Sequence, residues 1–237
     1  MQVEKLDLNK RDTFVIKCGG STLAALPESF YLEMRQLQQT GYAPVIVHGG
    51  GPAINEMLDK LGIETKFVNG LRQTSEAVLD VVEMVLAGQI NKQIVRKVQL
   101  TGADAIGLSG TDSGLIQAVP VANAHEVGLV GEVVSVNGGL LAKLVGLGVI
   151  PVIAPIGLGE DGRQRYNINA DTAAGAVAAH LGVSRLIVVT DVPGILRTGE
   201  DGSKQLLPVV TTSQVRDMIA SGDIYGGMIP KVKAAAA

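Results

Sequence analysis

Short runs of apolar, often β-branched residues alternate with longer stretches of helical periodicity along the chain. The runs are apolar at every position, which is typical of strands covered on both faces of a parallel sheet. The pattern predicts strands at residues 13–16, 44–47, 103–108, 149–154 and 186–189. It predicts helices at about residues 27–39, 53–61, 74–99, 140–145, 172–181 and 211–220. Such alternation indicates an α/β fold with a mainly parallel sheet.

The predicted helix at residues 74–99 is unusually long and carries one apolar stripe in two parts. The first part is Val78, Val81, Val82 and Val85, and the second, shifted in phase, is Ile90, Ile94, Val95 and Val98. Helical periodicity alone leaves two interpretations open, a helix of the core and a helix at a subunit interface.

The length of 237 residues allows one sizeable core, or two lobes that share a sheet. A glycine-rich, charged segment at 156–165 predicts the boundary, with lobes at residues 1–157 and 158–237. Within it, Gly157 to Gly162 matches a dinucleotide-binding string but carries two acids and leads into polar residues. We interpret it as an exposed turn.

Charge and cysteine content narrow the functional class. The net charge is −3 and aromatic residues make up 3% of the chain, so neither phosphate neutralisation nor base stacking favours a nucleic-acid partner. Cys18 is the only cysteine, which suits a reducing compartment. The first 12 residues lack an apolar signal core, and no apolar run approaches a membrane span. A cytoplasmic protein without a membrane partner is expected.

Two glycine-rich turns follow predicted strands. In the first, Lys17 precedes Gly19 and Gly20, and successive N–H groups beside a lysine can hold a phosphate. In the second, His48 precedes three glycines and Pro52, a residue suited to a helix start. A structural turn with an extended lysine remains an alternative for the first, and His48 is better read as a hydrogen-bonded turn residue than as a base.

Four further positions could carry chemistry. Arg72 offers a planar fork for a carboxylate, although a surface arginine is the simpler interpretation, and Thr74 is a candidate N-cap. Asp171 could cap a helix or order nearby lysines. The turn after the strand at 186–189 could meet a nucleotide or be a simple proline–glycine turn, and Lys231 could be a second phosphate contact. The classical G-x-x-x-x-G-K-[ST] loop is absent from the sequence.

In this order, the motifs from Phe14 to Lys233 resemble those of the amino acid kinase family. The resemblance implies an open αβα sandwich with a mainly parallel central sheet and two lobes. It is strongest to members that use ATP to phosphorylate the side-chain carboxylate of N-acetyl-L-glutamate, the second step of arginine biosynthesis. The N-terminal lobe would bind the acceptor and form a homodimer, and the C-terminal lobe would bind ATP.

The resemblance also assigns roles to residues. Lys17 and Lys231 would contact the transferring phosphoryl group, with Asp171 orienting both. The acceptor would be held by Gly50, Gly51, Arg72 and Asn167. The nucleotide would be bordered by Gly19, Gly20, Asp191, Val192, Pro193, Gly194, Ile195, Leu196, Asp223, Ile224 and Tyr225. Mg²⁺ would be held by ATP oxygens and water, so no protein ligand set is expected.

Other readings remain open. A kinase for a carrier-protein-linked aminoadipate or glutamate would need a wider entrance and commonly departs from Gly51. Carbamate, uridylate and aspartate kinases fit the motifs less well, and a binding module without catalysis would not need both lysines and Asp171. The alanine-rich end resembles a helix cut short, and the short N-terminal extension resembles dimeric, arginine-insensitive members.

Overall fold

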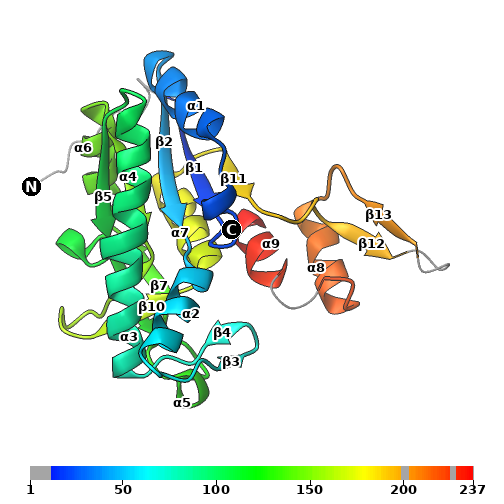
Figure 1. Cartoon of the computed structure of the whole chain (residues 1–237). Helices are drawn as coiled ribbons and strands as arrows, with labels where there is room; N and C mark the ends of the chain where they lie inside the picture. The colour runs from blue at the N-terminus through cyan, green and yellow to red at the C-terminus, as the bar shows by residue number, and fades with distance from the viewer. Residues whose placement is uncertain (1–11, 199–202, 225–227, 237) are drawn as a thin grey trace, which may run out of the picture.

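A five-stranded parallel sheet forms the centre of the computed structural model, which describes residues 12–198, 203–224 and 228–236 (Figure 1). Its strands follow the order β11-β1-β2-β8-β5, and all four neighbouring pairs are parallel. The strands are β1 (Asp12–Cys18), β2 (Tyr42–His48), β5 (Ala105–Ser109), β8 (Ile150–Ala154) and β11 (Leu186–Val189). All five predicted strands are confirmed, and their carboxyl ends lie at one edge of the sheet.

Helices cover both faces of this sheet, because successive side chains of a strand point to opposite sides. Phe14 and Ile16 of β1 belong to one core cluster, whereas Val15 between them belongs to another. The first face is covered by α1 (Glu28–Gln39), α2 (Gly51–Lys60), α3 (Glu76–Glu83) and α4 (Asn91–Leu100). The second is covered by α6 (Gly138–Gly146) and α7 (Ala170–Leu181). The predicted αβα sandwich is confirmed.

The long predicted helix is continuous but contains a π-helical segment, Met84–Ile90, between α3 and α4. A π turn holds one residue more than an α turn, so it rotates the stripe that follows. This accounts for the shift in phase between Val85 and Ile90. Both parts of the stripe are buried in the chain's own core, which supports the core interpretation of this helix.

A small closed barrel of four strands lies beyond the carboxyl edge of the sheet and was not predicted. Its strands are β6 (Ile116–Pro120), β7 (Val130–Val136), β9 (Ile156–Leu158) and β10 (Arg165–Ile168). The exposed turn predicted at Gly157 to Gly162 is confirmed only in part. Gly157 and Leu158 belong to β9, and the exposed connection to β10 is residues 160–163. The proposed boundary falls inside β9, and the division into lobes stays a prediction.

Smaller elements complete the described chain. They are the hairpin of β3 (Phe67–Val68) and β4 (Leu71–Arg72), helix α5 (Ala124–Val127), and 3-10 turns at Leu23–Ala25 and Asp112–Gly114. After β11 come the hairpin of β12 (Leu196–Thr198) and β13 (Lys204–Leu206), then α8 (Thr212–Ala220) and α9 (Met228–Ala236). Figure 1 shows this last hairpin and α8 projecting from the sheet, with α9 between α8 and α7. Within the described residues, no helix is long and apolar enough to span a membrane.

Deleting a residue at two positions of the long helix should test the role of the π-helical segment. Removal of Gly88, which is exposed and has open space around it, should return the segment to α-helical bonding with both stripes in phase. Removal of exposed Gln93 should instead rotate Ile94, Val95 and Val98 by about 100°. Moving these side chains out of the core should cost about 2–5 kcal/mol in urea unfolding, clearly more than the Gly88 deletion. Equal losses would contradict this account.

Candidate active site

Two glycine loops meet at the carboxyl ends of β1 and β2. A Cβ at Gly20 would lie 2.6 Å from the backbone nitrogen of Gly50 and 2.7 Å from that of Gly51, so the loops touch only because residue 20 has no side chain. The first intrahelical bond of α2 runs from the Ile54 N–H to the Gly50 carbonyl (3.0 Å). The Gly51 N–H therefore has no partner within α2 and is available to an anion. Pro52 lies in the first turn, as predicted.

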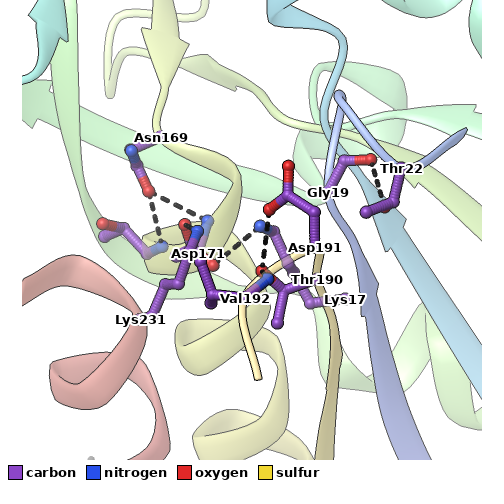
Figure 2. A network of polar contacts seen from close by, with 10 residues as sticks. Lys17, Gly19, Thr22, Asn169, Asp171, Thr190, Asp191, Val192 and Lys231 are labelled. Carbon is purple, nitrogen blue, oxygen red and sulfur yellow. Dashed lines mark hydrogen bonds and ion pairs between the residues drawn. The ribbon is translucent and has the colours of Figure 1, made fainter. Parts of the chain in front are cut away.

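Above these loops, one carboxylate binds two lysines (Figure 2). Asp171 Oδ1 lies 2.8 Å from Lys17 Nζ, and Asp171 Oδ2 accepts a hydrogen bond of 3.2 Å from Lys231 Nζ. The side chains of Lys17 and Asp171 are only 5% and 7% exposed, whereas that of Lys231 is 25% exposed. The three residues come from β1, α7 and α9, so tertiary structure alone brings them together.

Sequence reasoning left open whether Asp171 caps its helix, and the structure assigns the cap to Asn169. The Asn169 Oδ1 accepts hydrogen bonds from the N–H groups of Asp171 and Thr172, at 2.9 and 3.1 Å. The Asp171 side chain is thereby released from capping and can bind the lysines. Its position in the first turn of α7 also places it near the positive end of the helix dipole.

Burial lowers the pKa of Lys17 below its ordinary value, since the charged form loses hydration. The carboxylate of Asp171 opposes this effect, and the positive charge of Lys231 adds to it. A buried lysine is tolerated here because its ammonium group is paired with a carboxylate. The result is a positively charged group held in a fixed position at the floor of the site.

A cleft of about 200 Å³ runs from Lys17 and Asp171 to Arg72. All four residues predicted to hold the acceptor line it, namely Gly50, Gly51, Arg72 and Asn167, and so do Lys17, Gly20 and Asp171. Arg72 Nη2 donates to Asn55 Oδ1 (2.6 Å), while the buried Nη1 has no hydrogen-bond partner among the described residues. A buried, unpartnered N–H group of a guanidinium at the wall of a cleft suits a ligand carboxylate.

Thr74 was predicted to be an N-cap, and this prediction is wrong. Ser75 caps α3, accepting a hydrogen bond from the Val78 N–H, while Thr74 is fully buried. The Thr74 hydroxyl donates to the Arg72 carbonyl (2.8 Å) and accepts from Asn167 Nδ2 (3.1 Å). Thr74 thus connects two residues that were predicted to hold the acceptor and that lie far apart in the sequence.

His48 lies beneath the second glycine loop and is fully buried. Its Nδ1 lies 3.0 Å from the Gly49 carbonyl, which can only accept, so Nδ1 carries the proton. Its Nε2 then accepts from Asn91 Nδ2 at 3.3 Å, and the same amide donates to the Val152 carbonyl (2.8 Å). Burial lowers the pKa of His48 to about 4. His48 is therefore a neutral turn residue at pH 7, as the sequence suggested, and Asn91 is its unpredicted partner.

Two cavities lie on the other side of Lys231. One of about 420 Å³ is lined by Val192, Pro193, Gly194, Ile195, Leu196, Lys204, Asp223, Ile224, Met228 and Lys231. A second, of about 280 Å³, has mostly apolar walls that include Val188, Val210, Val215 and Val232. Seven of the predicted nucleotide residues thus line one cavity, and Lys204 and Met228 are additions that sequence reasoning missed.

The remaining predicted nucleotide residues lie elsewhere. Gly20 lines the cleft between Lys17 and Arg72, and the Gly19 N–H donates to the Val189 carbonyl (3.1 Å). Asp191 lines neither of these two cavities, and a hydrogen bond from the Ser21 side chain lowers its pKa, which places it beside the first glycine loop. Tyr225 lies outside the described residues. Among those described, no group of three or more His, Cys, Asp and Glu residues could hold a metal ion.

A parallel sheet with glycine loops and paired lysines at its carboxyl edge is an arrangement suited to phosphoryl transfer. The chain belongs to the amino acid kinase family, whose sequence model matches residues 12–237, so the predicted resemblance is confirmed. Proteins named acetylglutamate kinase are similar to it. Those of Halalkalibacterium halodurans and Geobacillus kaustophilus are 54% and 51% identical, each over 94% of this chain and 84% of the relative.

Solved structures agree with the fold. A Streptococcus mutans UA159 protein has a TM-score of 0.86 and 33% identity, with 95% of this chain and 89% of that chain covered. Giardia lamblia carbamate kinase bound to AMP-PNP has a TM-score of 0.70 and 16% identity, covering 95% of this chain and 87% of that chain. At that identity the second likeness shows the fold alone.

The lowered pKa of His48 should appear in the acid stability of the protein. As pH falls from about 6.5 to 4, the unfolded chain gains a proton on His48 before the folded chain does, so stability falls. This effect should amount to about 3 kcal/mol and should be largely missing in His48→Gln. Urea unfolding at pH 6.5, 5 and 4 measures it, with the same substitution at exposed His180 as the control. The same pH dependence in His48→Gln would contradict the burial argument.

Proposed function

We propose that the chain is an acetylglutamate kinase, transferring the γ-phosphoryl group of ATP to the side-chain carboxylate of N-acetyl-L-glutamate. The observation that carries the proposal is the position of the Lys17–Asp171–Lys231 cluster. Lys17 and Asp171 line the acceptor cleft, and Lys231 lines the cavities on the other side. The names and high identity of the relatives support the same substrate.

The chemistry requires charge neutralisation more than proton transfer. The acceptor carboxylate is already anionic, so one of its oxygens can attack the γ-phosphorus without a general base while the bond to the bridging oxygen of ADP breaks. The obstacle is repulsion between the carboxylate and the triphosphate. Lys17 and Lys231 would stabilise the charge on the transferring group, and the glycine-loop N–H groups would add fixed dipoles. The neutral His48 has no role in moving a proton.

The α-carboxylate of N-acetyl-L-glutamate, which does not react, would align the acceptor in the cleft. Arg72 Nη1 is buried, unpartnered among the described residues and set in the cleft wall, so it can bind the α-carboxylate. Asn167 would assist from the barrel, where Thr74 fixes its amide. The Arg72 guanidinium lies 4.8 Å from the centre of the Phe67 ring, which restrains it further.

The nucleotide would occupy the cavities beside Lys231. Their apolar walls suit a purine, and residues 192–196 together with Asp223 and Ile224 would border it. Four further residues would lie near the phosphates or the nucleoside, namely Gly19, Gly20, Asp191 and Tyr225. Mg²⁺, bound mainly through phosphate oxygens and water, would supply further neutralisation.

The remaining assignments are part of the proposal. The acyl phosphate product hydrolyses readily, so two lobes, residues 1–157 and 158–237, would close over it. A homodimer and a cytoplasmic location suit a biosynthetic enzyme whose only cysteine, Cys18, is buried and reduced.

Acceptor-dependent turnover provides the direct test. ADP release should require N-acetylglutamate and should be matched by hydroxamate formed when hydroxylamine traps the acyl phosphate. Glutamate, aspartate and carbamate should each give at least about tenfold lower kcat/KM, because they lack the N-acetyl group or the chain length. If ADP release is independent of every acceptor, the binding-module reading gains support instead.

Two variants should separate transition-state stabilisation from acceptor binding. Lys17→Ala should lower kcat by about 100-fold or more with a smaller effect on KM, because its charge acts on the transferring group. Arg72→Ala should raise the KM for N-acetylglutamate by about 10- to 100-fold, the value of a charged hydrogen bond. Arg96→Ala, which removes an exposed positive charge on α4, is the control. A reversed pattern would overturn both roles.

A further inference from the structure

Two of the three charged residues in the Lys17–Asp171–Lys231 cluster lie on helices, whereas Lys17 lies on the sheet. Helix α7 supplies Asp171 and helix α9 supplies Lys231, and the two helices pack directly on one another. Asp171 holds Lys17 as well, so the position of Lys231 relative to the buried pair depends on how α9 sits on α7 (Figure 2). One close backbone contact lies at this interface.

Gly175 of α7 meets Ala234 of α9 at this interface. A Cβ at Gly175 would lie 2.8 Å from Ala234 Cα, 2.9 Å from its Cβ and 2.9 Å from its carbonyl oxygen. Two of these three atoms belong to the backbone, so no rotamer change could relieve the overlap. The helices can approach this closely only because residue 175 has no side chain.

The contact and the ion pair lie on the same interface, one helical turn apart. Asp171 and Gly175 are four residues apart on α7, and Lys231 and Ala234 are three apart on α9, so each pair shares a helix face. If a side chain at position 175 of α7 pushed Ala234 away, the rigid turn of α9 between Ala234 and Lys231 would therefore move Lys231 as well.

We infer that Gly175 is a positioning residue that sets the distance of Lys231 from Asp171 and from the transferring group; this rests on the proposed function. Because alanine favours a helix more than glycine does, Gly175→Ala does not weaken α7 itself. Its effect arises from the spacing between the two helices. Misplacement of a reacting or stabilising group by about 1 Å can cost about 100-fold in rate.

Gly175→Ala is expected to lower kcat by about 10- to 100-fold and to leave the KM for N-acetylglutamate within about twofold. The acceptor cleft is lined by residues 167–171 of α7 and its approach, but not by Gly175 or α9. Gly146→Ala in α6 is the matched control, since Gly146 is exposed and a Cβ there meets nothing within 4 Å. It should retain wild-type kinetics.

A double-mutant cycle separates positioning from general damage. In a Lys231→Ala background, Gly175→Ala should change kcat by no more than about twofold, because the group it displaces is already missing. An equal loss in both backgrounds, or no loss in either, overturns the inference. Ala234→Val adds bulk to the same contact from α9 and should reproduce the Gly175→Ala result if that variant folds poorly.

A measurement without turnover distinguishes failure of this inference from failure of the proposed function. Acetic anhydride labelling followed by peptide mass spectrometry should modify Lys231 several-fold faster in Gly175→Ala than in wild type, while an exposed lysine such as Lys60 keeps its rate. If Lys231 is labelled faster in Gly175→Ala but the wild-type protein shows no acceptor-dependent ADP release, the role of the contact is supported and the kinase assignment is refuted. Unchanged labelling would refute the contact's role whatever the activity.

Discussion

The structure depends most on one buried carboxylate that binds two ammonium groups from different parts of the chain. Without Asp171, two lysines held close together would repel each other, and the buried Lys17 would lose its counter-ion. With Asp171 the three groups carry one net positive charge between the cleft that Lys17 and Asp171 line and the two cavities that Lys231 lines. The helix α7 that supplies the carboxylate packs on the sheet, so the core itself fixes the charge.

The parallel sheet determines where this charge can be used. Because all strands of the central sheet run in one direction, the loops after β1, β2 and β11 lie along a single edge. Side chains alternate between faces, which turns Lys17 toward α7 while its neighbours Ile16 and Cys18 enter the opposite core cluster. The loops that follow present backbone to the cleft, because residues 20 and 49–51 are glycines without side chains. The paired charges of Lys17 and Asp171 and the backbone of the glycine loops therefore line the same cleft.

Much of this could be predicted from the sequence, and the exceptions have physical causes. Uniformly apolar runs identified the sheet, and the order of the motifs identified the family and the residues of the cleft. The barrel was missed because its strands are not uniformly apolar runs: Gln117 and Pro120 interrupt β6, and Gly131, Glu132 and Ser135 interrupt β7. The choice of Ser75 over Thr74 as a cap, and the pairing of Asn91 with His48, are decided by tertiary contacts that neighbouring residues do not encode.

Three glycines of this protein act by allowing close contacts. Gly20 lets two loops touch, Gly50 lies against Leu86 and Ile90 of the π-helical segment, and Gly175 lets α9 approach α7. Each sits where a charged or hydrogen-bonding group must be placed accurately, and each is surrounded by rigid backbone or packed side chains. The π-helical segment contributes to this packing. Its residues Leu86 and Ile90 contact the glycine loop, and Asn91, directly after it, contacts His48. In the proposed reaction, this close packing would hold the charged groups in place, which matters because an acceptor that is already anionic needs accurately placed positive charge more than proton transfer.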